Sequence, residues 1–368
     1  MPHLDPPFRA DHVGSLLRPP EIRQARRRRA AGEIDDAELR AVEDSAIATM
    51  IPKLEATGIH SITDGEFRRE WFHLDFLQQL DGVTVSGTIA ASSDAGATVH
   101  QAPPKITVTG KLRHQRPIQV DDYRFLAQHA TRTPKVSIPS PTMVHFRGGR
   151  GGIDIESYPD LDEFFEDLAQ CYRDEVDALY AAGCRYLQLD DTNLAYLCDP
   201  VMRQGAVERG DDPDELPRTY AALINEAIAG RPDDLTVGIH LCRGNFRSKH
   251  FASGGYEAVA EVLFNEIDVD AYFLEYDDER SGDFAPLRFF PDDKTLVLGL
   301  VTSKTAELED EDVLKSRIDE AAAYVDLDQL CLSPQCGFSS TIDGNEITEA
   351  DQWAKLRHVV EVAADVWA

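Results

Sequence analysis

The chain has few basic residues, few cysteines and no long hydrophobic run, and each shortage excludes a class of protein. Lys and Arg number 37 against 66 Asp and Glu, which leaves a formal net charge of −29 over 368 residues. Such a surface repels phosphate backbones, so we expect no nucleic-acid partner. No apolar stretch approaches the roughly 20 residues needed to cross a bilayer, so we expect no membrane partner either. The basic run at 23–30 has acidic neighbours and is predicted to be the solvated face of a helix.

The six cysteines are too few and too widely spaced for a disulfide-stabilised secreted scaffold. The first fifteen residues lack the basic-then-apolar order of a secretory signal. We therefore expect a cytoplasmic protein with free thiols. Some of these thiols are candidates for metal ligands, and the pattern assigns no role to Cys198.

No G-x-G-x-x-G follows a predicted strand, which argues against a dinucleotide-binding fold. Short apolar runs instead alternate with segments of helical periodicity, a pattern typical of right-handed βαβ units and a parallel sheet. Eight such runs are predicted to be strands, at 11–15, 61–66, 135–139, 186–190, 236–241, 271–276, 295–301 and 329–333. Eight strands predict an α/β fold of the (β/α)8 TIM-barrel type. The whole chain, 1–368, is predicted to be one catalytic barrel.

The segment 81–118 breaks this alternation. Its residues alternate between polar and apolar around turns rich in glycine and serine. This pattern predicts an antiparallel, hairpin-like insertion after the second barrel unit.

Four soft-metal donors lie at or just past the ends of predicted strands: His240, Cys242, Glu275 and Cys336. Residues i and i+2 of a strand point to the same side, so His240 and Cys242 can reach one ion together. Imidazole, thiolate and carboxylate are the donors that Zn²⁺ prefers, and parallel strand ends converge at the C-terminal mouth of a barrel. The spacing thus predicts a metal site. Ordinary core cysteines and a hydrogen-bonded histidine are the alternative explanation.

The chain resembles the catalytic barrel of cobalamin-independent methionine synthase, and still more the short bacterial methyltransferases that contain this barrel alone. The resemblance covers nearly the whole chain and is carried by these segments: DHVGSLLRP, SITDGEFRREW, SIPSPTMVHFRGG, YLQLDDTNLAYLCDP, IHLCRGNFRS, FLEYDDERSGDFAPL, LGLVTSKTAELE and LCLSPQCGF. The family binds zinc through His, Cys, Glu and Cys. The resemblance therefore implies Zn²⁺ on His240, Cys242, Glu275 and Cys336.

The resemblance also implies where an amino-acid substrate is held. The turn formed by Val13, Gly14 and Ser15 corresponds to the family segment that binds the substrate carboxylate. Glu66 and Asp190 correspond to acids that bind its ammonium group. Capping of strand ends and solvation of loops are the alternative roles for such acids.

Two further positions differ from the full-length synthases. Asp191, the third implied substrate-binding acid, replaces a glutamate. Thr302 is predicted to stand where those enzymes carry a histidine that assists the leaving folate. The full-length synthases also carry a second, N-terminal barrel that helps to bind folate, and we expect none within these 368 residues. The methyl donor is therefore left open between methyltetrahydrofolate and a methylated corrinoid.

These observations predict a zinc-dependent methyltransferase that converts homocysteine to methionine. No catalytic side chain is expected beyond the metal ligands, because the zinc-activated substrate thiolate is itself the nucleophile. A zinc-dependent lyase or transferase acting on another thiol, such as coenzyme M, is one alternative. A zinc-binding relative without turnover is another. The sequence leaves open whether the chain forms a homo-oligomer.

Overall fold

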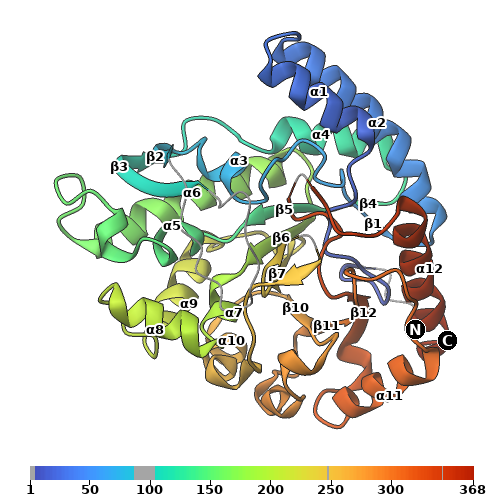
Figure 1. Ribbon diagram of the computed structural model, residues 1–368. Coiled ribbons are helices and arrows are strands. Elements are labelled where there is room, and N and C mark those ends of the chain that lie inside the picture. The colour runs from blue at the N-terminus through green and yellow to red at the C-terminus, as the bar shows by residue number, and fades with distance from the viewer. Residues whose placement is uncertain (1–4, 87–103, 247, 342) are drawn as a thin grey trace.

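Six parallel strands form the centre of the fold. The computed structural model describes residues 5–86, 104–246, 248–341 and 343–368. The strands are hydrogen-bonded in the order β12-β11-β10-β7-β6-β5, so all six lie in chain order around the sheet. They curve around the middle of the molecule, as Figure 1 shows. Their bounds are β5 Val136–Pro139, β6 Tyr186–Asp191, β7 Thr236–Leu241, β10 Ala271–Glu275, β11 Thr295–Val301 and β12 Leu330–Pro334.

The two ends of this sheet approach each other through shorter pieces. β1 (Ser61–Ile62) pairs in parallel with β4 (Thr133–Pro134), which leads directly into β5. At the other end, Ala10 forms a parallel bridge with Leu332 of β12. The predicted α/β fold with parallel strands is thus confirmed, with the first strand reduced to a bridge.

No continuous backbone ladder closes the ring between the segment around Gly14 and β1 among the described residues. Single hydrogen bonds join them instead. Thr63 Oγ1 donates to the Gly14 carbonyl at 2.7 Å, and the Leu16 amide donates to the Gly65 carbonyl at 3.0 Å. This seam lies beside the turn predicted to bind the substrate carboxylate.

Helices surround the strands (Figure 1). Their ends carry the expected signals. Asp35 caps α2 in a reciprocal capping box, and α6 is followed by Gly183 at a φ of 107°. No described helix is long and apolar enough to cross a membrane. The bounds are α1 Pro20–Ala30, α2 Asp36–Ala56, α3 Leu74–Leu77, α4 Val120–His129, α5 Met143–Phe146, α6 Leu161–Ala181, α7 Asn193–Tyr196, α8 Pro200–Glu208, α9 Leu216–Ala227, α10 Ala260–Glu266, α11 Glu311–Ala322 and α12 Glu349–Val366.

The basic run at 23–30 lies on α1, where the guanidinium groups pair with acidic side chains. Arg26 lies 3.1 Å from Glu43, and Arg29 lies 2.5 Å from Asp36. Much of this positive charge is therefore neutralised within the chain.

The predicted insertion is an antiparallel pair, β2 (Asp81–Ser86) with β3 (Lys105–Arg113). Its apolar side chains belong to the same core cluster as those of α6. Residues 87–103 of the predicted insertion lie outside the described residues. A second short pair, β8 (Asn245–Phe246) with β9 (Lys249–His250), follows β7.

Strand parity arranges the barrel interior in levels. Along β6, Tyr186 donates to Asp11 Oδ2 at 2.9 Å, and Gln188 donates to the Val13 carbonyl at 2.8 Å and to Asp190 Oδ1 at 2.7 Å. Alternate residues of one strand point to the same side, so this inward row ends on a carboxylate at the C-terminal mouth. β6 thereby places the Asp190 carboxylate at this mouth of the barrel.

Candidate metal centre and substrate cavity

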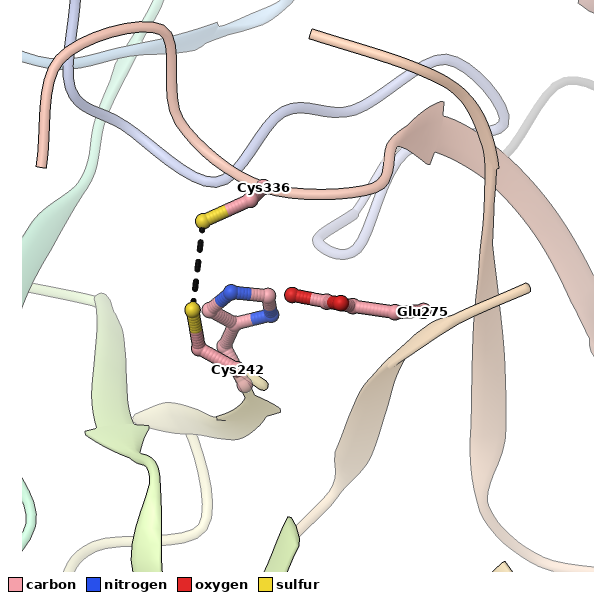
Figure 2. A group of neighbouring side chains, drawn as sticks. Cys242, Glu275 and Cys336 are labelled. Carbon is pink, nitrogen blue, oxygen red and sulfur yellow. Dashed lines mark hydrogen bonds between the residues drawn. The ribbon is translucent and has the colours of Figure 1, made fainter. Parts of the chain in front are cut away.

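Four ligand atoms converge at the C-terminal ends of the strands. One donor atom from each of His240, Cys242, Glu275 and Cys336 lies within 4.8 Å of the other three, and all four residues are buried. His240 comes from β7, Cys242 follows it, Glu275 ends β10 and Cys336 lies just past β12. In Figure 2 the two sulfur atoms point at each other, and the Glu275 carboxylate points toward the same space.

The donors fit a Zn²⁺ ion. The Sγ atoms of Cys242 and Cys336 lie 3.3 Å apart, and the buried Nε2 of His240 has no hydrogen-bond partner among the described residues. Nδ1 of the same ring lies 3.4 Å from the Phe273 carbonyl, an interaction that leaves the Nε2 lone pair free for an ion. Two thiolates, an imidazole and a carboxylate are donors of the kinds that zinc takes in proteins.

The two thiols behave as a pair that shares a proton. Their mutual hydrogen bond raises the pKa of Cys242 well above its ordinary value and lowers the pKa of Cys336 well below it. Cys336 therefore gives up its proton more readily than Cys242, and a bound cation would favour the thiolate form of both.

Two cations near the ligands were not predicted from the sequence. Arg243 is fully buried, and its Nη1 donates to Tyr256 Oη at 2.8 Å and to the Glu275 carbonyl at 3.0 Å. Lys304 donates to Asp277 at 3.1 Å. Burial raises the pKa of Glu275, and the charge of Lys304 opposes that rise. Arg243 directly follows a predicted ligand in sequence, which is a signal that could have found it.

Thr302 does not line the cavity beside this centre. Its amide donates to Glu309 Oε1 at 2.8 Å, while the Lys304 amide donates to its hydroxyl at 3.3 Å. Two residues further along, Lys304 is the side chain of this loop whose charge reaches the ligands.

A cavity of about 830 Å³ opens beside the cluster of donors. This volume is in the usual range for a small-molecule site, about 300–1,000 Å³. Three of the four donors line it: His240, Cys242 and Cys336. Four of the six predicted substrate residues line it as well: Val13, Ser15, Glu66 and Asp190.

The turn at Val13, Gly14 and Ser15 is held from both sides. Phe338 donates its amide to the Ser15 carbonyl at 2.9 Å, and a Cβ added at Gly337 would lie 1.9 Å from Ser15 Oγ. Gly14 has a φ of 140°, in a region that favours glycine. Backbone and hydroxyl groups are therefore fixed at the edge of the cavity.

Glu66 is the most unusual acid in the cavity. It has a φ of 58°, a conformation uncommon outside glycine and often associated with functional sites, and it is 4% exposed. Ser137 Oγ donates to its Oε1 at 3.2 Å, and Arg69 lies 3.5 Å from Oε2. Burial, opposed by Arg69, raises the pKa of Glu66 to about 7. Burial also raises the pKa of its neighbour Asp190.

Asp191 is not brought to the cavity. Its Oδ2 accepts from Thr142 Oγ1 at 2.5 Å and its Oδ1 accepts from the Leu194 amide at 2.8 Å, so it supports the first turn of α7. The side chain is fully buried. The six cysteines are buried and free, and Cys198 packs in the core with its Sγ 3.6 Å from the Leu194 carbonyl.

Comparison with known proteins gives the family. Residues 8–365 match the family model for the cobalamin-independent synthase, catalytic domain. The chain belongs to the cobalamin-independent methionine synthase family. The Bacillus subtilis protein YxjH, named as uncharacterized, is 50% identical over 366 residues, which cover 98% of this chain and 95% of that protein.

Other members of the family carry functional names. The methionine synthase of Pyrococcus horikoshii is 25% identical over 327 residues, covering 88% of this chain and 84% of that one. A crystal structure of a candidate vitamin-B12 independent methionine synthase from Listeria monocytogenes is 42% identical, has a TM-score of 0.80 and covers 99% of both chains. A B12-independent methionine synthase from Shewanella, solved in complex with selenomethionine, has the same fold, with a TM-score of 0.74 at 20% identity over 97% of both chains.

Proposed function

We propose that this chain is a zinc-dependent thiol methyltransferase that converts homocysteine to methionine. The observation that carries the proposal is one cavity lined at once by three of the four metal donors and by two buried carboxylates, Glu66 and Asp190. The donors suit the sulfur of the substrate, and the carboxylates suit its ammonium group. The family to which the chain belongs supports the same reaction.

The protein's residues would divide the work as follows. Zinc, when bound by His240, Cys242, Glu275 and Cys336, supplies a Lewis acid that stabilises the acceptor sulfur as a thiolate. Arg243 fixes the end of β10 through the Glu275 carbonyl and thereby orients that ligand.

The amino-acid end is held by the chain alone. Glu66 and Asp190 bind the ammonium group, and the turn at Ser15 binds the carboxylate. A thiolate fixed in this way attacks the methyl carbon of the donor, the carbon–sulfur bond forms, and the donor leaves with the electron pair of its broken bond.

The same carboxylates argue against a sulfonated acceptor thiol such as coenzyme M. A sulfonate at the position of the ammonium group would face Glu66 and Asp190, and like charges repel. The amino-acid thiol is therefore our choice.

We also propose that the whole chain acts as one catalytic unit in a reducing compartment. The described part of the insertion shares the core cluster of α6, and all six cysteines are buried as free thiols. Zinc ligation requires such reduced sulfur.

Methionine formation tests the function. Protein of measured zinc content is given homocysteine with methyltetrahydrofolate or with methylcobalamin, and a parallel reaction offers coenzyme M as the acceptor. We expect methionine with at least one donor, loss of activity after chelation, and recovery when Zn²⁺ is restored. Zinc-loaded protein that methylates coenzyme M but not homocysteine would overturn the choice of acceptor.

A further inference from the structure

The cavity wall contains a buried histidine whose ring has no hydrogen-bond partner. His73 is 1% exposed and lines the cavity, yet neither Nδ1 nor Nε2 has a partner among the described residues. Burial and the nearby charge of Arg147 hold the pKa of His73 well below its usual value. The neutral ring offers one donor and one acceptor, and leaving both unmade in a buried position is costly. A ligand that enters the cavity would satisfy them.

Two guanidinium groups line the same cavity. Arg147 has no ion pair with a carboxylate among the described residues, although the chain carries an excess of acids. Arg209 comes no nearer than 4.0 Å to Asp211, and its Nε and Nη2 have no hydrogen-bond partner in the described part of the chain. One carboxylate lining this wall is Glu208, which is exposed at the end of α8.

Aromatic rings connect this group of cations to the metal centre. Tyr196 Oη would lie 3.0 Å from a Cβ placed on Gly244, just past Cys242, and the Tyr196 ring is 6.0 Å from that of Phe146. Arg209 in turn lies over the Phe146 ring, with its Cζ 5.3 Å from the ring centroid. The cavity therefore runs from the donor cluster, along an aromatic wall, to the guanidinium groups of Arg147, which has no ion pair among the described residues, and of Arg209, which has only the long contact with Asp211.

We propose that His73, Arg147 and Arg209 form a subsite for an anionic group, a carboxylate or a phosphate, on the methyl donor. This inference rests on the proposed methyl transfer, in which the carboxylate of the amino acid is held at Ser15. The aromatic wall between the two ends suits a flat or apolar body that links the anionic group to the reacting methyl. Guanidinium forks bind carboxylates and phosphates through paired, charge-assisted hydrogen bonds.

Binding of simple probes tests the subsite without any turnover. The zinc-loaded protein is titrated with phenyl phosphate, with 4-aminobenzoylglutamate and with neutral 4-aminobenzamide, by calorimetry and by the fluorescence of Trp71, which lines the cavity. The first two probes separate phosphate from carboxylate as the preferred group. We expect at least one of them to bind more tightly than the amide, with an affinity that falls as salt is added.

Matched variants locate the binding. R147M and R209M should each weaken the anionic probe by on the order of tenfold, the usual effect of losing a charge-assisted hydrogen bond. H73F should weaken it without changing the salt dependence. The matched control for the double variant R147M/R209M is R124M/R218M, which removes two positive charges at exposed arginines outside the cavity. It should bind the anionic probe as the wild type does.

Three results would overturn the subsite: equal binding of the anionic probes and the amide, no binding of either anion, or unchanged binding in R147M/R209M. Where methionine is formed, R147M must raise the KM of the donor and leave that of homocysteine unchanged; the reverse would assign the arginines to the amino acid. Absence of turnover with normal probe binding would refute the proposed reaction and leave the subsite standing.

Discussion

Binding of the amino acid should release a proton from Glu66. Burial raises the pKa of this carboxyl from its ordinary 4.5 to about 7, so the unliganded site holds the proton over much of the neutral range. An ammonium group placed against the carboxylate favours its ionised form and drives the proton off. The product methionine is the ligand to use, because it has the ammonium group of homocysteine but no thiol. Every proton released on binding therefore comes from the protein.

The size of the effect follows from the pKa. If the ligand lowers the pKa of Glu66 well below 6, binding should release about 0.9 proton at pH 6, about 0.5 at pH 7 and about 0.1 at pH 8. Methionine affinity should correspondingly rise with pH up to about 7 and then level off. Calorimetry in two buffers of different ionisation enthalpy, repeated at each pH, measures the released protons directly.

E66Q is the decisive variant, because an amide keeps the shape of the side chain and cannot titrate. It should bind methionine more weakly and with no proton release, whereas E70Q, at an exposed acid nearby, should match the wild type. Proton release that persists in E66Q, or that is absent from the wild type at pH 6, would refute the assignment of Glu66 to the ammonium group.

Unfolding gives an independent check on the same pKa. Because the folded-state pKa of Glu66 lies above the unfolded one, the group's contribution to stability is full below pH 4.5 and is lost as the pH rises through about 7. The free energy of unfolding of E66Q, measured by denaturant titration, should fall less over this interval than that of the wild type. Parallel curves would contradict the raised pKa.

Three other changes test separate parts of the structure. C336A should lose zinc and activity together, whereas C184A, a buried cysteine outside the cluster, should keep both; elemental analysis decides, and full zinc occupancy in C336A would refute the ligand set. D11N should lower the free energy of unfolding by about 3–5 kcal/mol in guanidinium titrations, because it removes the charge that pairs with the fully buried Lys135, whose Nζ lies 3.1 Å from Asp11 Oδ1; a loss under about 1 kcal/mol would show that the pair is not needed. G337A should raise the KM of homocysteine by on the order of tenfold, because the added Cβ would lie 1.9 Å from Ser15 Oγ and must push this hydroxyl aside. An unchanged KM would show that Ser15 does not bind the substrate carboxylate.

Much of the donor cluster could be predicted because it depends on local rules. His240 and Cys242 are two residues apart at the end of one strand, so parity alone puts them on the same side. Glu275 ends β10 and Cys336 lies just past β12, two strands of the same parallel sheet, whose C-terminal ends lie at one edge. The same parity places Asp190, which shares the inward row of Gln188, at the cavity and turns Asp191 away from it.

The sequence by itself therefore determined the strand-and-helix alternation, the family and the four converging donors. Only the tertiary structure decided which loop residues complete the cavity. His73, Arg147 and Arg209 follow different strands, and Lys304 lies in a loop after β11. No periodicity relates such residues, because loop positions depend on how the helices and turns pack. The raised pKa of Glu66 has the same origin: it comes from the burial of one carboxyl by the packing of distant segments, which no local pattern encodes.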